Sequence, residues 1–138
     1  MKRQRHTTTF CLLVLLGLAM AAVGPAAASE AVPKLVHLIV EDDELIASNV
    51  RGSRFDKLKL SAKEVIKKQA VAEAVIVVVT NQRIIGYSVF GASWRPLRTE
   101  AGERILSVEV EDYSALVQTN RRWLNFNGKS GVWGETDR

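Results

Sequence analysis

The residues whose types could support chemistry are few, and they are spread along the sequence. The densest group of acids is Glu41-Asp42-Asp43-Glu44, four consecutive carboxylates that could bind Ca²⁺, because hard cations prefer clustered oxygen ligands. A solvated hairpin turn explains the same residues. We favour the hairpin, because the equivalent turns of the repeats described below contain no such run of acids.

No other group of residues forms a recognisable catalytic or cofactor site. His37 stands alone in an apolar stretch, so it can form neither a histidine-based zinc site nor a triad with an identifiable serine. The single cysteine, Cys11, falls in the N-terminal segment. Residues 128–130 resemble the end of a phosphate-binding loop, but Trp123 stands where that motif requires glycine. We therefore predict a protein that is not an enzyme and needs no cofactor.

Three aromatic residues and two arginines are candidates for ligand binding. Phe55, Trp94 and Trp133 could line a pocket for a sugar or another planar ligand, but their equivalent positions in three repeats favour contacts between sheets. Arg83 and Arg122 occupy matched turns, where they could offer a polar edge to a partner. We favour a structural role in which each arginine bonds backbone carbonyls of the turn.

Residues 1–28 have the three regions of a secretory signal peptide. A cationic start at residues 2–5 precedes the uncharged apolar run Phe10–Val23, and small residues lead to a predicted cleavage site after Ala28. The apolar run is shorter than the roughly 20 residues that a transmembrane helix takes. We expect one exported domain over 29–138, periplasmic or extracellular, with no stable membrane anchor after cleavage.

Removing this segment changes the charge balance of the protein. Three of the 19 basic residues and none of the 15 acidic ones leave with it, so 16 bases face 15 acids and the net charge is +1. Affinity for nucleic acid depends on basic residues that neutralise phosphates. We therefore expect no nucleic-acid partner.

The sequence after residue 28 repeats itself with a period of 39 residues and no gap. Repeats of this kind indicate one structural unit that is stacked several times. Identical residues at this offset include Glu64 and Glu103, Thr80 and Thr119, Asn81 and Asn120, Arg83 and Arg122, and Trp94 and Trp133. The same offset extends backwards and places Phe55 on Trp94. We assign the repeats to 29–62, 63–101 and 102–138.

The patterning within each repeat is typical of short β-strands. Leu106, Val108 and Val110 alternate with polar residues, which indicates a half-buried strand. Residues 61–74 are ambiguous, because Ser61 to Glu64 match a helix capping box and helix-forming residues follow. Alignment of the repeats predicts a strand there. We favour the strand, because propensity is the weaker guide.

Four short strands in about 40 residues, with an aromatic residue near the start of the fourth, resemble a β-propeller blade of the quinoprotein or WD-like type. The matching stretches are Thr80-Asn81-Gln82-Arg83 with Tyr87, Gly91 and Trp94, and Thr119-Asn120-Arg121-Arg122 with Phe126, Gly131 and Trp133. The resemblance implies an all-β fold of three tandem four-stranded blade-like repeats that serve protein–protein contacts. A β-trefoil or another small β-sandwich or barrel is the alternative fold.

Three blades are too few to close a propeller, which typically has four to eight. Residues 75–79 are apolar on both faces of their predicted strand, so both faces must be covered. We therefore expect a homo-oligomer or a protein partner, with two chains able to complete a six-bladed ring. The function we predict is that of an exported non-enzymatic binding or scaffold module, and the alternative is a small carbohydrate-binding, lectin-like protein.

Overall fold

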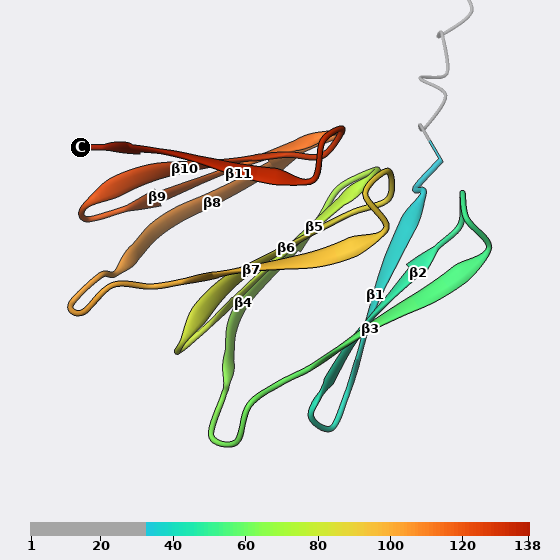
Figure 1. Ribbon diagram of the computed structural model, residues 1–138, viewed down its shortest axis with the longest axis horizontal. Helices are drawn as coiled ribbons and strands as arrows, with labels where there is room; N and C mark the ends of the chain where they lie inside the picture. The colour runs from blue at the N-terminus through green and yellow to red at the C-terminus, as the bar shows by residue number, and fades with distance from the viewer. Residues whose placement is uncertain (1–32) are drawn as a thin grey trace, which may run out of the picture. The chain divides into compact units, whose positions relative to one another are not determined.

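The computed structural model describes residues 33–138, which form eleven antiparallel strands in three sheets and no helix (Figure 1). The first sheet has the order β1-β2-β3, the middle sheet β4-β5-β6-β7 and the last sheet β11-β10-β9-β8. The strands are β1 (Val36–Glu41), β2 (Glu44–Asn49), β3 (Arg54–Lys59), β4 (Ile66–Val71), β5 (Val75–Thr80), β6 (Arg83–Ser88), β7 (Ser93–Arg98), β8 (Ile105–Glu111), β9 (Ser114–Thr119), β10 (Arg122–Asn127) and β11 (Val132–Asp137). The predicted all-β class is confirmed.

The strands follow the 39-residue period of the sequence. Strands β1, β5 and β9 begin at Val36, Val75 and Ser114, each 39 positions after the one before. The same interval separates every other described strand from its counterpart in the next sheet. Each sheet is built within one repeat, which agrees with blade-like repeats and differs from the single barrel of a trefoil.

The first sheet has three strands within the described range, where we expected four. The counterpart of β4 and β8 would fall at residues 27–32, which lie outside the described residues. The predicted signal peptide over 1–28 lies outside them as well. None of the described residues forms a helix that is long and apolar enough to cross a membrane.

The ambiguous segment forms a turn and then a strand, as the repeat alignment predicts. Ser61 N–H donates to the Glu64 carboxylate at 2.8 Å, and Glu64 N–H donates to the Ser61 carbonyl at 3.0 Å. These are the bonds of a tight turn. Strand β4 follows, because its backbone pairs with β5 along one edge, with a register shift between Ile66 and Lys68, and thereby satisfies backbone groups that a lone segment would leave unpaired. Tertiary context outweighs helix propensity here.

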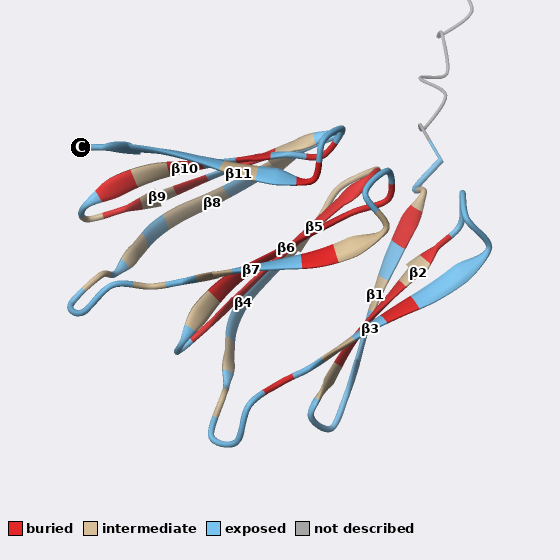
Figure 2. Cartoon of the chain, in the orientation of Figure 1, coloured by how far each residue is buried: buried red, intermediate tan, exposed pale blue. Residues whose placement is uncertain are grey.

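Strand β5 is buried along its whole length (Figure 2). The two apolar cores lie on its two faces. Ile76 and Val78 join the core shared with the first sheet. Val75, Val77 and Val79 join the core shared with the last sheet. The middle sheet is therefore covered on both sides, as its apolar strand requires.

Candidate functional site

The two tryptophans of the predicted site join neighbouring sheets. Trp94 Nε1 in β7 donates to the Asp56 carbonyl in β3 at 2.9 Å, and its side chain is only 9% exposed. Trp133 Nε1 in β11 donates to the Arg95 carbonyl in β7 at 2.9 Å. Donors and acceptors are both 39 positions apart, so the two bonds are copies of one contact.

The two arginines of the predicted site also join sheets. Arg83 donates from Nε to Glu64 Oε1 at 2.8 Å and from Nη2 to Oε2 at 3.0 Å. Its Nη2 also donates to the Lys59 carbonyl, at the end of the preceding sheet, at 3.1 Å. Because the Thr80 hydroxyl donates to the same carboxylate at 2.8 Å, one cluster fixes the β5–β6 turn and the neighbouring sheet.

The last sheet repeats this cluster. Arg122 donates to both carboxylate oxygens of Glu103, at 2.9 and 3.1 Å, and to the Arg98 carbonyl at 3.2 Å. Its hydrogen bonds and charge interactions with Glu103 raise the pKa of Arg122. The two arginines thus have structural bonds to backbone and carboxylate groups.

The acids of both clusters have lowered pKa values. Burial alone would raise the pKa of Glu64, but hydrogen bonds from Arg83, Ser61 and Thr80 outweigh it and hold the pKa at about 2. The pKa of Glu103 is lowered in the same way, with burial opposed by Arg122.

A buried polar network, absent from our sequence predictions, lies between the first and middle sheets. The Tyr87 hydroxyl donates to Asp56 Oδ2 at 2.6 Å and accepts a bond from Asn49 Nδ2 at 3.0 Å. Burial and the neighbouring carboxylate raise the pKa of the tyrosine. In the next repeat, Phe126 takes the place of Tyr87, and Arg95 takes the place of Asp56. These residues cannot form the network, so the repeat pattern gives no signal for it.

The acidic run forms the turn between β1 and β2. Glu41 pairs with Glu44 across the strands, and Asp42 and Asp43 form the turn itself. Glu44 accepts an ion pair from Lys57 at 3.1 Å, and Asp43 from Lys59 at 3.3 Å. Residues 33–138 contain no group of three or more histidine, cysteine or acidic side chains placed to hold a metal ion.

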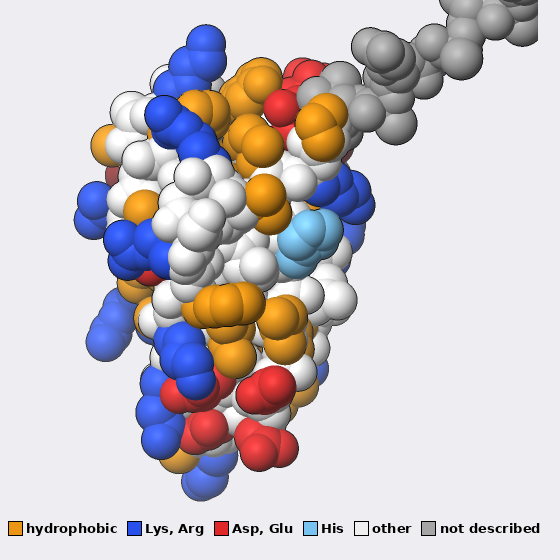
Figure 3. Space-filling model, turned by 90° about the vertical axis from the view of Figure 1, so that its right-hand side faces the viewer, with side chains coloured by type: hydrophobic (Ala, Val, Ile, Leu, Met, Phe, Trp, Pro, Cys, Tyr) orange, Lys and Arg blue, Asp and Glu red, His pale blue; other side chains and the backbone are white. Residues whose placement is uncertain are grey.

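Phe55 lies apart from the two tryptophans with which it aligns. Residues opposite one another in antiparallel strands share a face, and the register joins His37, Ser48 and Phe55 into one row. This row faces away from the middle sheet together with the next row on the same face, which contains Ile39 and Ile46, and we call the two rows the first outer face. Phe55 is 66% exposed there. Hydrophobic side chains gather over this side of the molecule (Figure 3).

The opposite end of the stack is a second open face. Leu116, Asn125 and Gly134 form one row of the last sheet, and Trp123 lies in the next row. We call these residues the last outer face. A hollow of about 280 Å³ on it is lined by Leu116, Trp123, Asn125, Gly134, Glu135 and Thr136.

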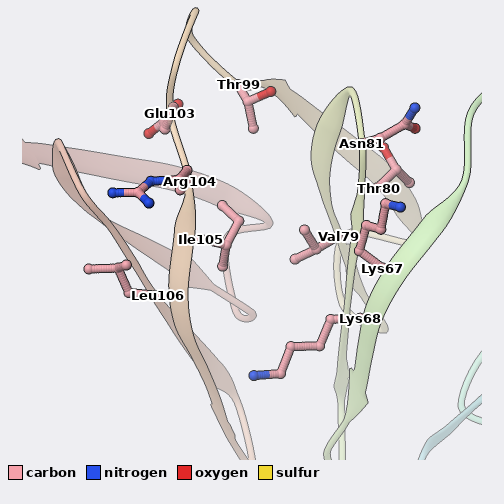
Figure 4. Close-up of a pocket in the computed structure, with 10 residues that line it drawn as sticks. All are labelled: Lys67, Lys68, Val79, Thr80, Asn81, Thr99, Glu103, Arg104, Ile105 and Leu106. Atoms are coloured by element: carbon pink, nitrogen blue, oxygen red, sulfur yellow. The ribbon is translucent and has the colours of Figure 1, made fainter.

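A larger pocket, of about 410 Å³, lies between the middle and last sheets (Figure 4). Val79 of β5 and Ile105 of β8 point toward one another across it and form an apolar floor. Lys67, Lys68 and Arg104 contribute cationic groups around it. None of our predicted ligand-binding residues lines this pocket.

The five predicted ligand-binding residues therefore do not form one site. Four of them make matched contacts between sheets, and Phe55 occupies the same position at an open end. The chain matches no protein-family model, and no curated protein is significantly similar to it in sequence.

Proposed function

We propose that this protein is a non-enzymatic binding module, and that it acts through protein–protein contacts at the two open ends of its stack of sheets. The observation that carries this proposal is the exposure of Phe55, in contrast to the buried Trp94 at the matching position of the middle sheet. An aromatic side chain that is covered in one repeat and bare in another indicates a missing neighbour.

The composition of the first outer face supports a protein as that neighbour. Ile39 and Val50, 37% and 50% exposed, accompany Phe55 at this end of the stack. In the middle sheet the matching residues, Val78 and Val89, are buried against the first sheet. Large apolar side chains at the centre of a patch are typical of protein interfaces.

A lectin-like function has less support. Sugar binding would require the ring faces of Trp94 and Trp133 to be exposed. Trp94 is buried instead, and both indole N–H groups are bonded to the neighbouring sheet. We therefore favour protein contacts over carbohydrate binding. The signal-peptide pattern of residues 1–28 supports action in the periplasm or outside the cell.

Photo-crosslinking in cells tests the proposal. Benzoylphenylalanine would replace Phe55 in one variant and Leu116 in another, so that each outer face carries a probe. Val65 is the control position, because it is 52% exposed but lies in the connection between the first two sheets. Probes on the outer faces should give discrete protein adducts and the control should give none. Equal labelling from all three positions, or sugar binding on a glycan array that is lost in Trp94→Ala, would overturn the proposal.

A further inference from the structure

We propose that the partner is a second copy of this chain, which docks head to tail so that Phe55 of one copy lies over Gly134 of the other. This inference rests on the proposed function and names its partner. Both the shape of each open face and the contacts already made inside the stack point to this arrangement.

The two internal interfaces follow one rule. At the first, Tyr87 and Trp94 of the middle sheet lie in the row that faces the row of Ala47 and Asp56. The tyrosine and tryptophan rings are themselves in contact, with centroids 5.0 Å apart. An aromatic row of the later sheet thus covers a row of the earlier sheet.

The second interface repeats the first, 39 residues later. Phe126 and Trp133 form the aromatic row, with ring centroids 4.8 Å apart, and face the row of Gly86 and Arg95. The Phe126 ring lies so close to Gly86 that a Cβ there would be 2.9 Å from ring carbons. The small residue makes room for the ring.

The open ends carry the two halves of a third interface of this kind. Counting back 39 residues from Tyr87 and Trp94 gives Ser48 and Phe55 on the first outer face. Counting forward from Gly86 and Arg95 gives Asn125 and Gly134 on the last outer face. Head-to-tail docking would therefore place Phe55 over Gly134, and Ser48 beside Asn125.

The last outer face has a space at the required position. The hollow of about 280 Å³ is lined by Gly134 together with Leu116 and Trp123. The nearest heavy atom to a Cβ built on Gly134 is the Asn125 carbonyl oxygen, 3.9 Å away. An aromatic ring from a second copy would find apolar side chains around it and no side chain beneath it.

Backbone groups at the two ends extend the same rule. Leu35 N–H donates to the Glu73 carbonyl at 2.8 Å, and Ala74 N–H donates to the Asp112 carbonyl at 2.9 Å. The next donor in this series is Tyr113 N–H. Because the series advances by 39 residues, its acceptor in a second copy would be the carbonyl that precedes Leu35.

A side-chain series behaves in the same way. Asn49 Nδ2 donates to the Val89 carbonyl at 3.0 Å, and Ser88 Oγ donates to the Gly128 carbonyl. The next donor is Asn127, which is exposed at the end of β10, on the same side of that strand as Asn125 of the last outer face. Its acceptor in a second copy would be the carbonyl of Val50, which is exposed at the first outer face.

Two internal bonds have no equivalent in the proposed contact. Phe55 lacks the indole N–H of Trp94 and Trp133, and Glu44 stands where Arg83 and Arg122 donate to the neighbouring sheet. The contact between copies should therefore be weaker than the contacts within a chain, and it should be reversible and dependent on concentration.

Two copies are the number that closes a ring. Two chains of three sheets supply six, within the four to eight sheets of typical propellers, whereas three chains would supply nine. A head-to-tail contact either closes into a ring or continues as a filament. In the closed dimer each copy gives both of its outer faces, so the contact occurs twice.

The mass of the protein in solution tests this inference. The full chain is expressed in bacteria and purified in the form that the cells yield. Light scattering across a dilution series should give the mass of two chains at high concentration and the mass of one chain on dilution. The mass of one chain is measured on the denatured protein. Phe55→Trp should lower the dissociation constant, by about fivefold for each contact and about 25-fold for the two, because it restores the indole donor. Phe55→Asp and Gly134→Trp should each raise it by at least about 100-fold.

Val65→Asp is the matched control, because it places the same acid at a similarly exposed apolar position away from both outer faces. It should leave the dissociation constant unchanged. A monomer at every concentration would overturn the inference, as would a dimer indifferent to Phe55 and Gly134, or a filament that grows with concentration.

The crosslinking experiment separates this failure from that of the proposed function. If the purified protein is monomeric but the Phe55 probe gives an adduct with a different protein, the binding function stands and self-association is wrong. If neither experiment yields a protein contact at the outer faces, both proposals are wrong.

Discussion

Arg83 reaches the carboxylate of Glu64 with two parallel hydrogen bonds, of 2.8 and 3.0 Å, although the residues are 19 positions apart in the chain. The Glu64 side chain is completely buried. A buried carboxylate with a bidentate arginine partner is among the stronger polar contacts in proteins. This pair therefore holds the turn that leads from the first sheet into the middle sheet.

We predict that Glu64→Gln lowers the free energy of unfolding by about 1–3 kcal/mol, because it replaces the buried carboxylate that pairs with the partly buried guanidinium of Arg83. Urea denaturation followed by tryptophan fluorescence measures this. Glu41→Gln is the control, since Glu41 is exposed at the end of β1, and it should change stability by less than about 0.5 kcal/mol. Equal effects of the two changes would contradict the structural role of the pair.

Stability should decline in acid because of the same residue. The pKa of Glu64 is about 2 in the folded protein and near 4.5 in the unfolded chain, so the unfolded state binds the proton first as the pH falls. The stabilisation is complete above about pH 5 and is lost progressively toward pH 2. Glu103, with its lowered pKa, adds to the decline in the same direction.

Urea midpoints measured from pH 7 to pH 2 would show this decline. The slope below pH 5 should be shallower in Glu64→Gln, which has no carboxylate to titrate. A variant with the slope of the natural protein would show that other acids are responsible.

The buried network gives a third prediction. Tyr87→Phe removes the hydroxyl that donates to Asp56 and accepts from Asn49. The buried Asp56 carboxylate and the buried Asn49 amide each lose one hydrogen-bond partner. We expect a loss of about 1–3 kcal/mol in the free energy of unfolding. Tyr113→Phe is the control, because the Tyr113 hydroxyl bonds Glu73 at an exposed site, and its effect should stay below about 0.5 kcal/mol. Thermal unfolding that ranks the two variants in the opposite order would refute this.

The close approach of two sheets gives a fourth prediction. Gly86→Ala would force a methyl group to 2.9 Å from the Phe126 ring, and we expect a cost of about 1–3 kcal/mol as the ring moves. The fluorescence of Trp133, which contacts Phe126, should also shift. At concentrations where the chain is monomeric, Gly134→Ala meets open space and should leave stability within about 0.5 kcal/mol. A stable Gly86→Ala variant with unchanged fluorescence would contradict the observed contact.

The fold could be predicted from the sequence to a large extent, because the repeats align without a gap. Once Trp94 aligns with Trp133, the alternation in one repeat supports the strands in the others. The segment 61–74 shows the value of this, since its local residues favour a helix and its counterpart in the third repeat forms β8. Residues 66–71 form a strand because they bond to the neighbouring strand, and the helix propensity of single residues takes no account of such bonds.

The roles of individual residues were less predictable. Alignment showed that Arg83 and Arg122 are equivalent, but the glutamates that they bind come from turns 19 residues earlier. The network around Tyr87 could not be predicted, because its three members lie in three different strands and the other repeats lack it. The open position of Phe55 depends on whether the aromatic row of each sheet faces the preceding or the following sheet, and equivalent residues do not reveal that direction.

The regular spacing of the strands has a consequence for how such a chain can change in length. Because each sheet bonds its predecessor through residues at fixed positions, such as Trp133 with Arg95, a further unit of 39 residues could be spliced in and would meet ready-made acceptors. A single inserted residue within β10 would instead turn Phe126 from the interior to the solvent. Gain or loss of a whole unit should therefore preserve the contacts between sheets, whereas a single insertion within a strand should break them.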